Sequence, residues 1–305
     1  MIVVCGEALV DLVPSDDGLG YRARPGGSPA NVAVALGRLG VHVGLVARLS
    51  HDHFGQMIRD HLLRSLVDLD YAIDAPERST VAMVSLRPGG DAEYLFAIEG
   101  CADGGWHPRQ LPGALPPGPA LHVSGSLALA VPSMWVALNA LVRRERADRV
   151  ICLDPNPRPA LSPNVDALRE RLQGWVPTAD IVKASAEDLA WAYPGEDPTG
   201  VAGRWRAAGP TLVVITRGGD GVLAVGPNGV VDRPGPAVEV VDTVGAGDAF
   251  TAGLLARLRD RGLLSRPGLR GLSSDDLADV VDHGQRVAAF TCTRVGADPP
   301  WWHQL

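Results

Sequence analysis

Lysine is almost absent from this sequence: Lys183 is the single lysine among 305 residues. A phosphate-binding loop of the Walker A type needs a glycine-lysine pair followed by serine or threonine. Because Val182 precedes Lys183, that loop is excluded. Any phosphate chemistry in this chain must therefore rest on another scaffold.

Positive charge is also scarce, with 28 lysine and arginine residues against 35 aspartate and glutamate residues and a formal net charge of −7. No basic run is long enough to follow a nucleic-acid backbone, so nucleic acid is not an expected partner. Long apolar runs are missing too, and we expect no membrane span. Residues 1–10 lack a charged beginning and contain Glu7, so they predict a buried strand over 2–10 rather than a signal peptide.

Cysteine is limited to four residues. Cys5, Cys152 and Cys292 lie in apolar segments without the spacing of a metal site, so we expect reduced core residues and a cytoplasmic protein. Cys101 lies in a polar loop, where a small structural residue and a reactive thiol both remain open.

The most informative stretch is DTVGAGDAF at 242–250, which joins an apolar run to a helix-like run. Gly245 and Gly247 allow a tight turn close to a ligand, and the free N–H groups of the following helix would point at a phosphate. Asp248, in the first turn, is placed as a base for an attacking hydroxyl. Helix capping by Asp242, with Asp248 complementing the helix dipole, is the alternative interpretation.

Two polar residues interrupt apolar segments near the N-terminus. Asp11 follows the expected first strand, and a carboxylate among apolar neighbours needs a hydrogen-bonding partner, which a polar ligand or a turn would supply. Asn31 begins an expected helix that is apolar on nearly every side and follows Gly26 and Gly27. Asn31 therefore either caps that helix or holds the hydroxyl groups of a substrate.

The second half of the chain alternates between apolar β-like runs and helical periodicity, which predicts a doubly wound parallel sheet. Expected strands lie at 121–124, 149–153 and 180–182, and expected helices at 132–146 and 165–172. The length fits one large α/β domain or two ordinary ones.

Residues 80–98 predict a β-hairpin around a turn at 87–91, and this hairpin is a candidate lid. Apolar residues occupy both of its faces, more than a solvated flap should carry. We therefore expect the chain to form a homodimer through the lid.

The stretch at 242–250 and the pattern Gly26-Gly27-x-x-x-Asn31 resemble the two signatures of the ribokinase-like (phosphofructokinase B) family of carbohydrate and nucleoside kinases. The resemblance covers nearly the whole chain. It implies one domain over 1–305, with a ribokinase-like, three-layer, doubly wound and mostly parallel α/β sheet and a small β-sheet lid from roughly 12–24 and 78–103. It also implies ATP and Mg²⁺ as cofactors and a sugar as the substrate.

By that resemblance, Asp248 is the catalytic base, and an anion hole for the γ-phosphate is formed by Gly245, Ala246 and Gly247. The residues implied in holding the sugar are Asp11, Gly26, Gly27 and Asn31. The stretch 154–158 is similar to the Asp-x-Asn-x-Arg segment of fructokinase-like and ketodeoxygluconate-kinase-like members, which would turn Arg158 toward substrate or phosphate. A proline-rich loop with an internal ion pair is an equally adequate account of that stretch.

The residues implied in binding the nucleotide are Lys183, Ser185, Thr216, Gly218, Gly221 and Gln285. The stretch 183–188 resembles the Asn-x-x-Glu region of the family, with Ser185 and Asp188 in place of the usual pair. Asp188 would then act on Mg²⁺ indirectly. A simple helix cap at Ser185 and a plain hairpin at 216–221 remain open.

The loop 293–299 resembles the C-terminal loop that encloses K⁺ in potassium-activated members of the family. The residues implied there, mostly through backbone oxygens, are Asp242, Val244, Thr291, Arg294 and Gly296. Pro300 stands where a hydroxyl residue is sometimes found, so K⁺ activation stays open.

The resemblance favours a fructokinase-like ketose kinase, with a 2-keto-3-deoxygluconate, ribose or nucleoside kinase as alternatives within the family. A dinucleotide-binding oxidoreductase would explain Gly245 and Gly247, but Phe250 stands in place of the third glycine. A ligand-binding protein that has lost catalysis is the third interpretation, and the presence of Asp248 argues against it.

Overall fold

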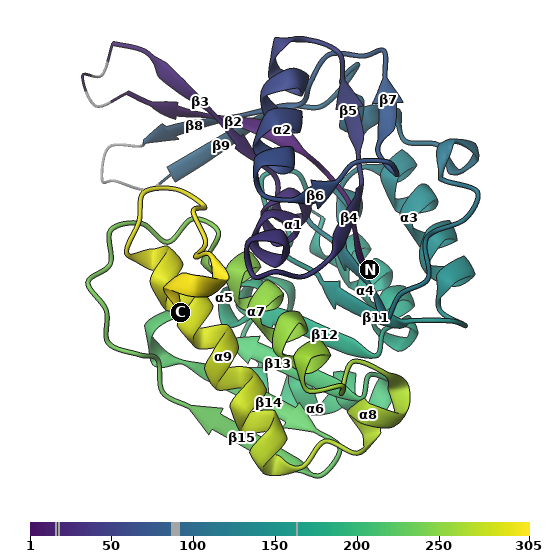
Figure 1. Ribbon diagram of the computed structural model, residues 1–305, viewed down its shortest axis with the longest axis vertical. Coiled ribbons are helices and arrows are strands. Elements are labelled where there is room, and N and C mark those ends of the chain that lie inside the picture. Colours follow the sequence, from purple (N-terminus) through teal and green to yellow (C-terminus); the bar gives the residue numbers. More distant parts are fainter. Residues whose placement is uncertain (16, 18, 87–91, 163) are drawn as a thin grey trace.

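The computed structural model describes residues 1–305 apart from 16, 18, 87–91 and 163, and its centre is a nine-stranded sheet in the order β15-β14-β13-β12-β11-β10-β1-β4-β6 (Figure 1). The strands from β13 to β6 are parallel, whereas β14 and β15 run antiparallel at one edge. The doubly wound, mostly parallel sheet predicted from the sequence is confirmed. In chain order the strands are β1 Ile2–Cys5, β4 Val43–Val46, β6 Val67–Asp68, β10 Ala120–Ser124, β11 Val150–Asp154, β12 Ile181–Ser185, β13 Leu212–Thr216, β14 Val222–Gly226 and β15 Gly229–Arg233.

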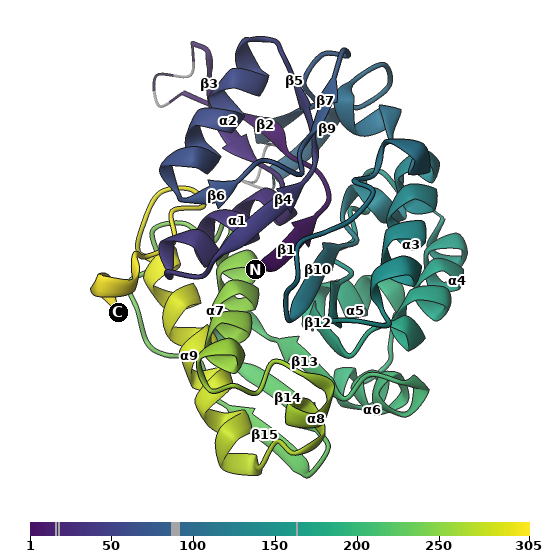
Figure 2. The same ribbon diagram turned by 45° about the vertical axis from the view of Figure 1, so that its right-hand side comes forward.

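Helices cover both faces of this sheet, because alternate side chains of its strands enter two separate apolar cores. Ile2 and Val4 of β1 belong to one core, and Val3 and Cys5 to the other. The two layers lie on opposite sides of the sheet in Figure 2. The first core receives α1 Ser28–Arg38, α2 His53–Arg64, α7 Ala246–Asp260 and α9 Ser274–Cys292, and the second receives α3 Pro132–Glu145, α4 Val165–Trp175, α5 Ala186–Ala192 and α6 Pro198–Ala208.

The short helix α8 (Arg266–Arg270) connects α7 to α9. None of the described helices is both long and apolar enough to cross a lipid bilayer.

A smaller, four-stranded sheet projects from the main body at the upper left of Figure 1. It has the order β3-β2-β8-β9, with β2 and β8 parallel and the outer pairs antiparallel. Its strands are β2 Leu9–Pro14, β3 Tyr21–Gly26, β8 Val81–Leu86 and β9 Ala92–Ala97. These are the segments predicted to form the lid, and the turn predicted at 87–91 lies outside the described residues. A third sheet pairs β5 (Arg48–Ser50) with β7 (Ile73–Ala75).

The single strand predicted for residues 2–10 is wrong, because the chain leaves the central sheet after β1 and enters the small sheet as β2. Gly6 lies at the break with φ of 151°, and a side chain there would collide with Cγ of Pro29 in α1. This packing bends the chain. Asp11 consequently lies within β2 and not in a turn.

The apolar run before α7 belongs to a loop. Residues 234–240 have no regular secondary structure, and Val240 and Val241 are 58% and 54% exposed. The backbone of this loop is attached to the end of α9, since the N–H groups of Val241 and Asp242 both donate to the carbonyl of Cys292. The loop therefore reaches α7 across the end of α9.

Candidate active site

The helix α7 begins at a turn built for close approach. Gly245 has φ of 76°, the left-handed region, and a Cβ there would lie 2.5 Å from Cβ of Ala297. Among the described residues, no acceptor pairs with the N–H groups of Gly247 and Asp248. Free amides at a helix N-terminus carry partial positive charge, so this turn has the features that an anion site requires.

Asp248 lies in this first turn and is buried, with 8% of its surface exposed. The hydroxyl of Ser28 donates to Oδ1 of Asp248 at 2.7 Å, and Nδ2 of Asn31 donates to Oδ2 at 2.9 Å. The hydroxyl of Ser124, at the end of β10, donates in turn to Oγ of Ser28 at 3.1 Å. The two regions predicted to form the site, α1 and α7, are thus joined directly through the carboxylate.

Ser28 was not predicted as a site residue, because its position at the start of α1 is that of an ordinary helix-capping residue. One feature of the sequence could have revealed it. Ser28 and Asn31 are three residues apart, so they share one face of a helix that is otherwise apolar. Two polar side chains on one face of a buried helix require a polar partner, and here that partner is Asp248.

Burial raises the pKa of Asp248 above its usual value, although the hydrogen bonds from Ser28 and Asn31 and the charge of Lys183 act in the opposite direction. A carboxylate with a raised pKa is a better proton acceptor than one in water. The environment of Asp248 therefore suits a general base.

Lys183 extends from β12 toward the same turn, because a Cβ on Gly247 would lie 2.9 Å from its Nζ. Nζ also donates to Oδ2 of Asp154 at 2.9 Å, and both side chains are buried. Burial lowers the pKa of Lys183, but the carboxylates of Asp154 and Asp188 outweigh that effect and hold it above its usual value. A cation is consequently fixed beside the free amides of α7, where a phosphate would carry negative charge.

Asp11 lies in β2, and Arg158 lies in the loop that follows β11. A Cβ on Gly26 would collide with Oδ2 of Asp11. Because glycine has no side chain, the Asp11 carboxylate of β2 can lie beside β3 at this position. Burial raises the pKa of Asp11 to about 6, Arg158 lowers it, and Asp248 raises it further. Arg158 and Asp248 are thus both within electrostatic reach of Asp11.

Gly27 packs against the backbone of the segment that joins β1 to β2. A Cβ on Gly27 would lie 2.9 Å from the carbonyl oxygen of Glu7. Arg158 is oriented within its own loop, where its Nη1 donates to Oδ1 of Asn156 at 2.7 Å. Gly27 therefore lies against the backbone between β1 and β2, and Arg158 has no carboxylate partner among the described residues.

The residues predicted on the nucleotide side lie at the carboxyl ends of β12 and β13, where parallel sheets bind ligands. Ser185 and Asp188 form a reciprocal capping box on α5, with N···O distances of 3.0 and 3.1 Å. Ser185 therefore caps the N-terminus of α5, which is the alternative that the sequence left open. Thr216 ends β13, and the turn through Gly218 and Gly221 follows directly.

Gln285 of α9 is placed differently from the other predicted nucleotide residues. Its Nε2 donates to the carbonyl of Pro234 at 2.9 Å, and its side chain is buried. Gln285 thus attaches α9 to the loop that starts after β15. Its amide is already engaged in the structure of the protein itself.

The proposed monovalent-cation residues are brought together only in part. Asp242 accepts at Oδ1 from the N–H of Val244 at 3.1 Å and at Oδ2 from the N–H of Gly296 at 2.7 Å, so it joins the two loops. The Thr291 hydroxyl donates to the Val287 carbonyl at 2.9 Å, and Arg294 pairs with Asp298 at 2.9 Å. Those two side chains therefore point to other partners.

No group of three or more metal-ligating side chains was found in the part of the chain that the structure describes. A divalent cation here would have to take most of its ligands from the substrate phosphates and from water. Mg²⁺ commonly binds in that way, through one or two carboxylates. Asp188 and Asp154 influence each other electrostatically, and both act on the charge of Lys183.

Two further carboxyl groups are buried where the chain passes from the central sheet to the small one. Glu7 lies in the break between β1 and β2, and Asp103 lies in a 3₁₀ turn after β9. Burial raises the pKa of Asp103 to about 8, and the neighbouring Glu7 raises it further. Asp103 is therefore largely protonated at neutral pH.

Because the folded-state pKa of Asp103 lies above its usual value of 3.8, the folded protein binds this proton more tightly than the unfolded chain. Stability from this group is complete below about pH 4 and is lost as the pH rises through about 8. We expect Asp103→Asn, which cannot ionise, to stabilise the protein relative to wild type by about 3 kcal/mol more at pH 8 than at pH 5. Urea denaturation at both pH values measures the difference.

The exposed Asp148→Asn variant is the matched control for that experiment, because it removes the same charge from the surface. Its free energy of unfolding relative to wild type should be nearly independent of pH. A difference between Asp103→Asn and wild type that is the same at pH 5 and pH 8 would contradict the assignment of a protonated Asp103.

The chain is similar over most of its length to proteins of known family and structure. The model of the family described as "pfkB family carbohydrate kinase" matches residues 1–304. A fructokinase of Rhizobium leguminosarum bv. trifolii is 37% identical over 285 residues, which are 92% of this chain and 87% of that protein. The solved structure of Xylella fastidiosa fructokinase with bound ATP is 26% identical, with a TM-score of 0.88 over 97% of this chain and 93% of that one.

A second solved structure is that of Vibrio cholerae O395 fructokinase with fructose, ADP and a calcium ion. It is 29% identical to this chain and has a TM-score of 0.84 over 97% of this chain and 94% of that one. A double mutant of the Vibrio enzyme has been solved with fructose, ADP and a potassium ion at the same identity and TM-score. The Xylella and Vibrio enzymes share the fold of this chain, and in the Vibrio structures fructose, ADP and a metal ion are bound together.

Proposed function

Because the chain belongs to the pfkB family of carbohydrate kinases, we propose that it transfers the γ-phosphoryl group of ATP to a hydroxyl group of fructose or a closely related ketose. The family makes it a phosphotransferase that acts on a sugar, and ATP with a divalent metal ion is the expected donor. Fructose is favoured because the relative from Rhizobium, 37% identical, and the Vibrio and Xylella enzymes are all fructokinases.

The observation that carries the mechanism is the position of Asp248. Its carboxylate is buried, oriented by Ser28 and Asn31, and adjacent to the unpaired amides at the start of α7. In our proposal Asp248 accepts the proton of the sugar hydroxyl while that oxygen forms a bond to the γ-phosphorus. The bond from the γ-phosphorus to the bridging oxygen breaks, its electrons stay on the β-phosphate, and ADP leaves.

The sugar would be held by the polar groups around this carboxylate. Asp11, in the small sheet, would accept hydrogen bonds from sugar hydroxyls, and its charge is partly balanced by Arg158. Gly26 and Gly27 leave room for the ring against the backbone, since side chains at these positions would meet Asp11 and Glu7. Asn31 retains a second amide hydrogen and its carbonyl oxygen for the sugar.

The transferring phosphoryl group would lie between the free amides of Gly247 and Asp248 and the ammonium of Lys183. These groups are fixed before the reaction, so they stabilise negative charge without reorganising. The remaining nucleotide would extend along the carboxyl ends of β12 and β13. Residues proposed to contact it there are Ser185, Thr216, Gly218 and Gly221, with Gln285 reaching it from α9. Gly245 and Ala246 would complete the turn around the γ-phosphate.

For the metal ions, we propose Mg²⁺ and K⁺. Mg²⁺ would bind the phosphates of ATP and reach Asp188 through water, which fits the lack of a multi-ligand cluster among the described residues. K⁺ would bind where Asp242 joins its two loops, with oxygens from Val244, Thr291, Arg294 and Gly296. The potassium-bound form of the Vibrio enzyme supports a test for K⁺ activation.

We propose that residues 1–305 form one catalytic domain in which the four-stranded sheet acts as a lid over the sugar, excluding water. Exposed apolar side chains on this sheet, Tyr21 at 49% and Leu95 at 68%, would pack on the same sheet of a second copy. The four cysteines are free, which agrees with a reducing, cytoplasmic compartment.

The test is the rate of ADP formation with fructose, ribose, 2-keto-3-deoxygluconate, glucose and adenosine, each with and without K⁺. We expect kcat/KM for fructose to exceed that for each other acceptor by at least about tenfold, which corresponds to about 1.4 kcal/mol in transition-state binding. A preference for ribose, the sugar acid or adenosine would instead support the matching alternative. ADP formation equal with and without any acceptor would contradict a sugar kinase.

A further inference from the structure

A cavity lies at the end of the central sheet opposite the candidate active site. It has a volume of about 450 Å³, and its wall includes Asp180 and Thr211, which immediately precede β12 and β13. Lys183 and Ser185 lie further along β12, toward its other end. A volume of this size can hold a small metabolite. The cavity is therefore separate from the residues assigned to catalysis.

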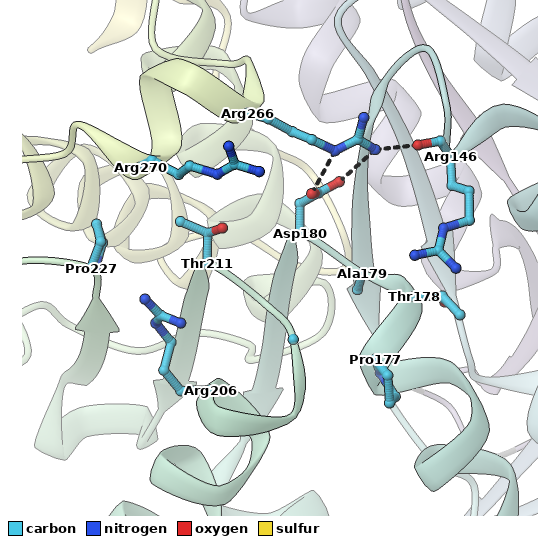
Figure 3. Close-up of a pocket in the computed structure, with 11 residues that line it drawn as sticks. Arg146, Pro177, Thr178, Ala179, Asp180, Arg206, Thr211, Pro227, Arg266 and Arg270 are labelled. Atoms are coloured by element: carbon cyan, nitrogen blue, oxygen red, sulfur yellow. Dashed lines mark hydrogen bonds and ion pairs between the residues drawn. The ribbon is translucent and has the colours of Figure 1, made fainter.

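Four arginines line this cavity: Arg146, Arg206, Arg266 and Arg270. Figure 3 shows that they reach it from different elements, with Arg266 and Arg270 on α8, Arg206 on α6 and Arg146 at the end of α3. Four guanidinium groups in one cavity repel one another unless an anion lies between them. In a chain with a net charge of −7, such a concentration of positive charge is unusual.

Only one of these charges is neutralised by a carboxylate. Asp180 is the single acidic residue in the wall, and it pairs with Arg266 through Nε at 2.9 Å and Nη2 at 3.3 Å. In the described part of the chain, no carboxylate pairs with Arg146, Arg206 or Arg270. The cavity therefore carries an uncompensated positive charge of about three.

The hydrogen bonding of Arg206 is a second, independent indication that a ligand binds in this cavity. Its Nη1 donates to the carbonyl of Pro210 at 3.0 Å, but its buried Nε has no partner among the described residues. A buried donor without an acceptor is costly, and such groups often mark a site where a ligand or water belongs. The Thr211 side chain beside it can donate one more hydrogen bond.

We propose that this cavity binds a small, multiply charged phosphorylated metabolite. Phosphate oxygens accept paired hydrogen bonds from the planar guanidinium group, which makes arginine the favoured residue for such ligands. Arg146, Arg206 and Arg270 supply the charge, and Arg266 is held in place by Asp180. The size of the cavity excludes a folded macromolecule as the occupant.

Isothermal titration calorimetry with pyrophosphate and with 3-phosphoglycerate tests this proposal directly. We expect both to bind wild-type protein, with an affinity that falls as KCl is raised, because the site is charged and partly exposed. The double variant Arg146→Gln/Arg270→Gln should bind at least about tenfold more weakly, since each lost charge-assisted contact weakens binding by about that factor. Citrate, which has similar charge without phosphate, should bind more weakly than 3-phosphoglycerate.

The matched control is Arg109→Gln/Arg143→Gln, which removes two exposed arginines outside the cavity and leaves the net charge equal to that of the test variant. It should bind both probes as wild type does. Both variants should form ADP with fructose at the wild-type rate when no probe is present, which shows that the test variant is folded. Equal binding by the test and control variants, or no binding at about 10 mM probe, overturns the proposal.

Discussion

Asp248→Asn is expected to lower kcat for ADP formation with fructose by about 10²–10⁴-fold, the contribution of a positioned general base. The asparagine side chain has the same shape as aspartate. Ser28 and Asn31 can still bond to it after rotation of the hydroxyl and amide groups that now donate to the carboxylate. The variant therefore removes the proton acceptor and leaves the packing of α1 against α7. A steady-state assay of ADP formation gives kcat and KM for both substrates.

Asp260→Asn provides the control for this experiment, because Asp260 ends the same helix and its side chain is 52% exposed. Its kcat should match that of wild type. Both variants should retain the thermal unfolding midpoint of wild type within a few degrees. ADP formation by Asp248→Asn at the wild-type rate would show that this carboxylate is not the base.

Lys183→Met is expected to lower kcat by about 10²–10³-fold, because it removes a fixed cation from beside the transferring phosphoryl group. It should also destabilise the protein by about 3–5 kcal/mol, since Asp154 is fully buried and loses its partner. The two effects must be separated before the loss of activity can be assigned to the phosphate.

The double variant Lys183→Met/Asp154→Asn separates them. Removing both charges should recover most of the lost stability, because no unpaired ion is left in the interior. The loss of kcat should persist. The single variant Asp154→Asn keeps the ammonium group and reports any role of that carboxylate by itself. If the double variant regained activity together with stability, Lys183 would be a structural residue and would not bind phosphate.

The parts of the site that could be predicted from the sequence are those whose residues are close neighbours in the chain. Gly245, Gly247 and Asp248 lie within one turn, so their spacing alone indicates an anion site with a carboxylate beside it. The alternation of strands and helices likewise predicts the parallel sheet, because each unit carries its own periodicity. Both predictions depend only on neighbours in the chain.

Features that depend on contacts between distant segments could not be predicted in the same way. The break at Gly6 arises because Pro29 of α1 packs against it, and nothing in residues 2–10 reveals that contact. The pairing of Lys183 with Asp154 joins two adjacent strands whose ends meet only in the folded sheet. The path of the exposed loop at 234–240 also depends on a distant contact, because the N–H groups of Val241 and Asp242 donate to the carbonyl of Cys292 at the end of α9.

The arginine-lined cavity was missed for the same reason. Its charges come from three helices that are far apart in the chain, and each arginine alone looks like an ordinary surface residue. Only the fold places them around one volume. Charge counted along the sequence, which is negative overall, gives no indication of such a local excess.

The lone buried lysine has a practical consequence for the chemistry of labelling. A protein of this length usually offers many amines to acylating reagents, but here the only amines are the N-terminus and Lys183, whose side chain is 5% exposed. If ATP binds as proposed, an acyl-phosphate derivative of ATP would deliver its acyl group next to that one side chain. A mass added to the wild-type protein and absent from Lys183→Met would then report occupancy of the proposed nucleotide site, because the N-terminal amine is present in both proteins.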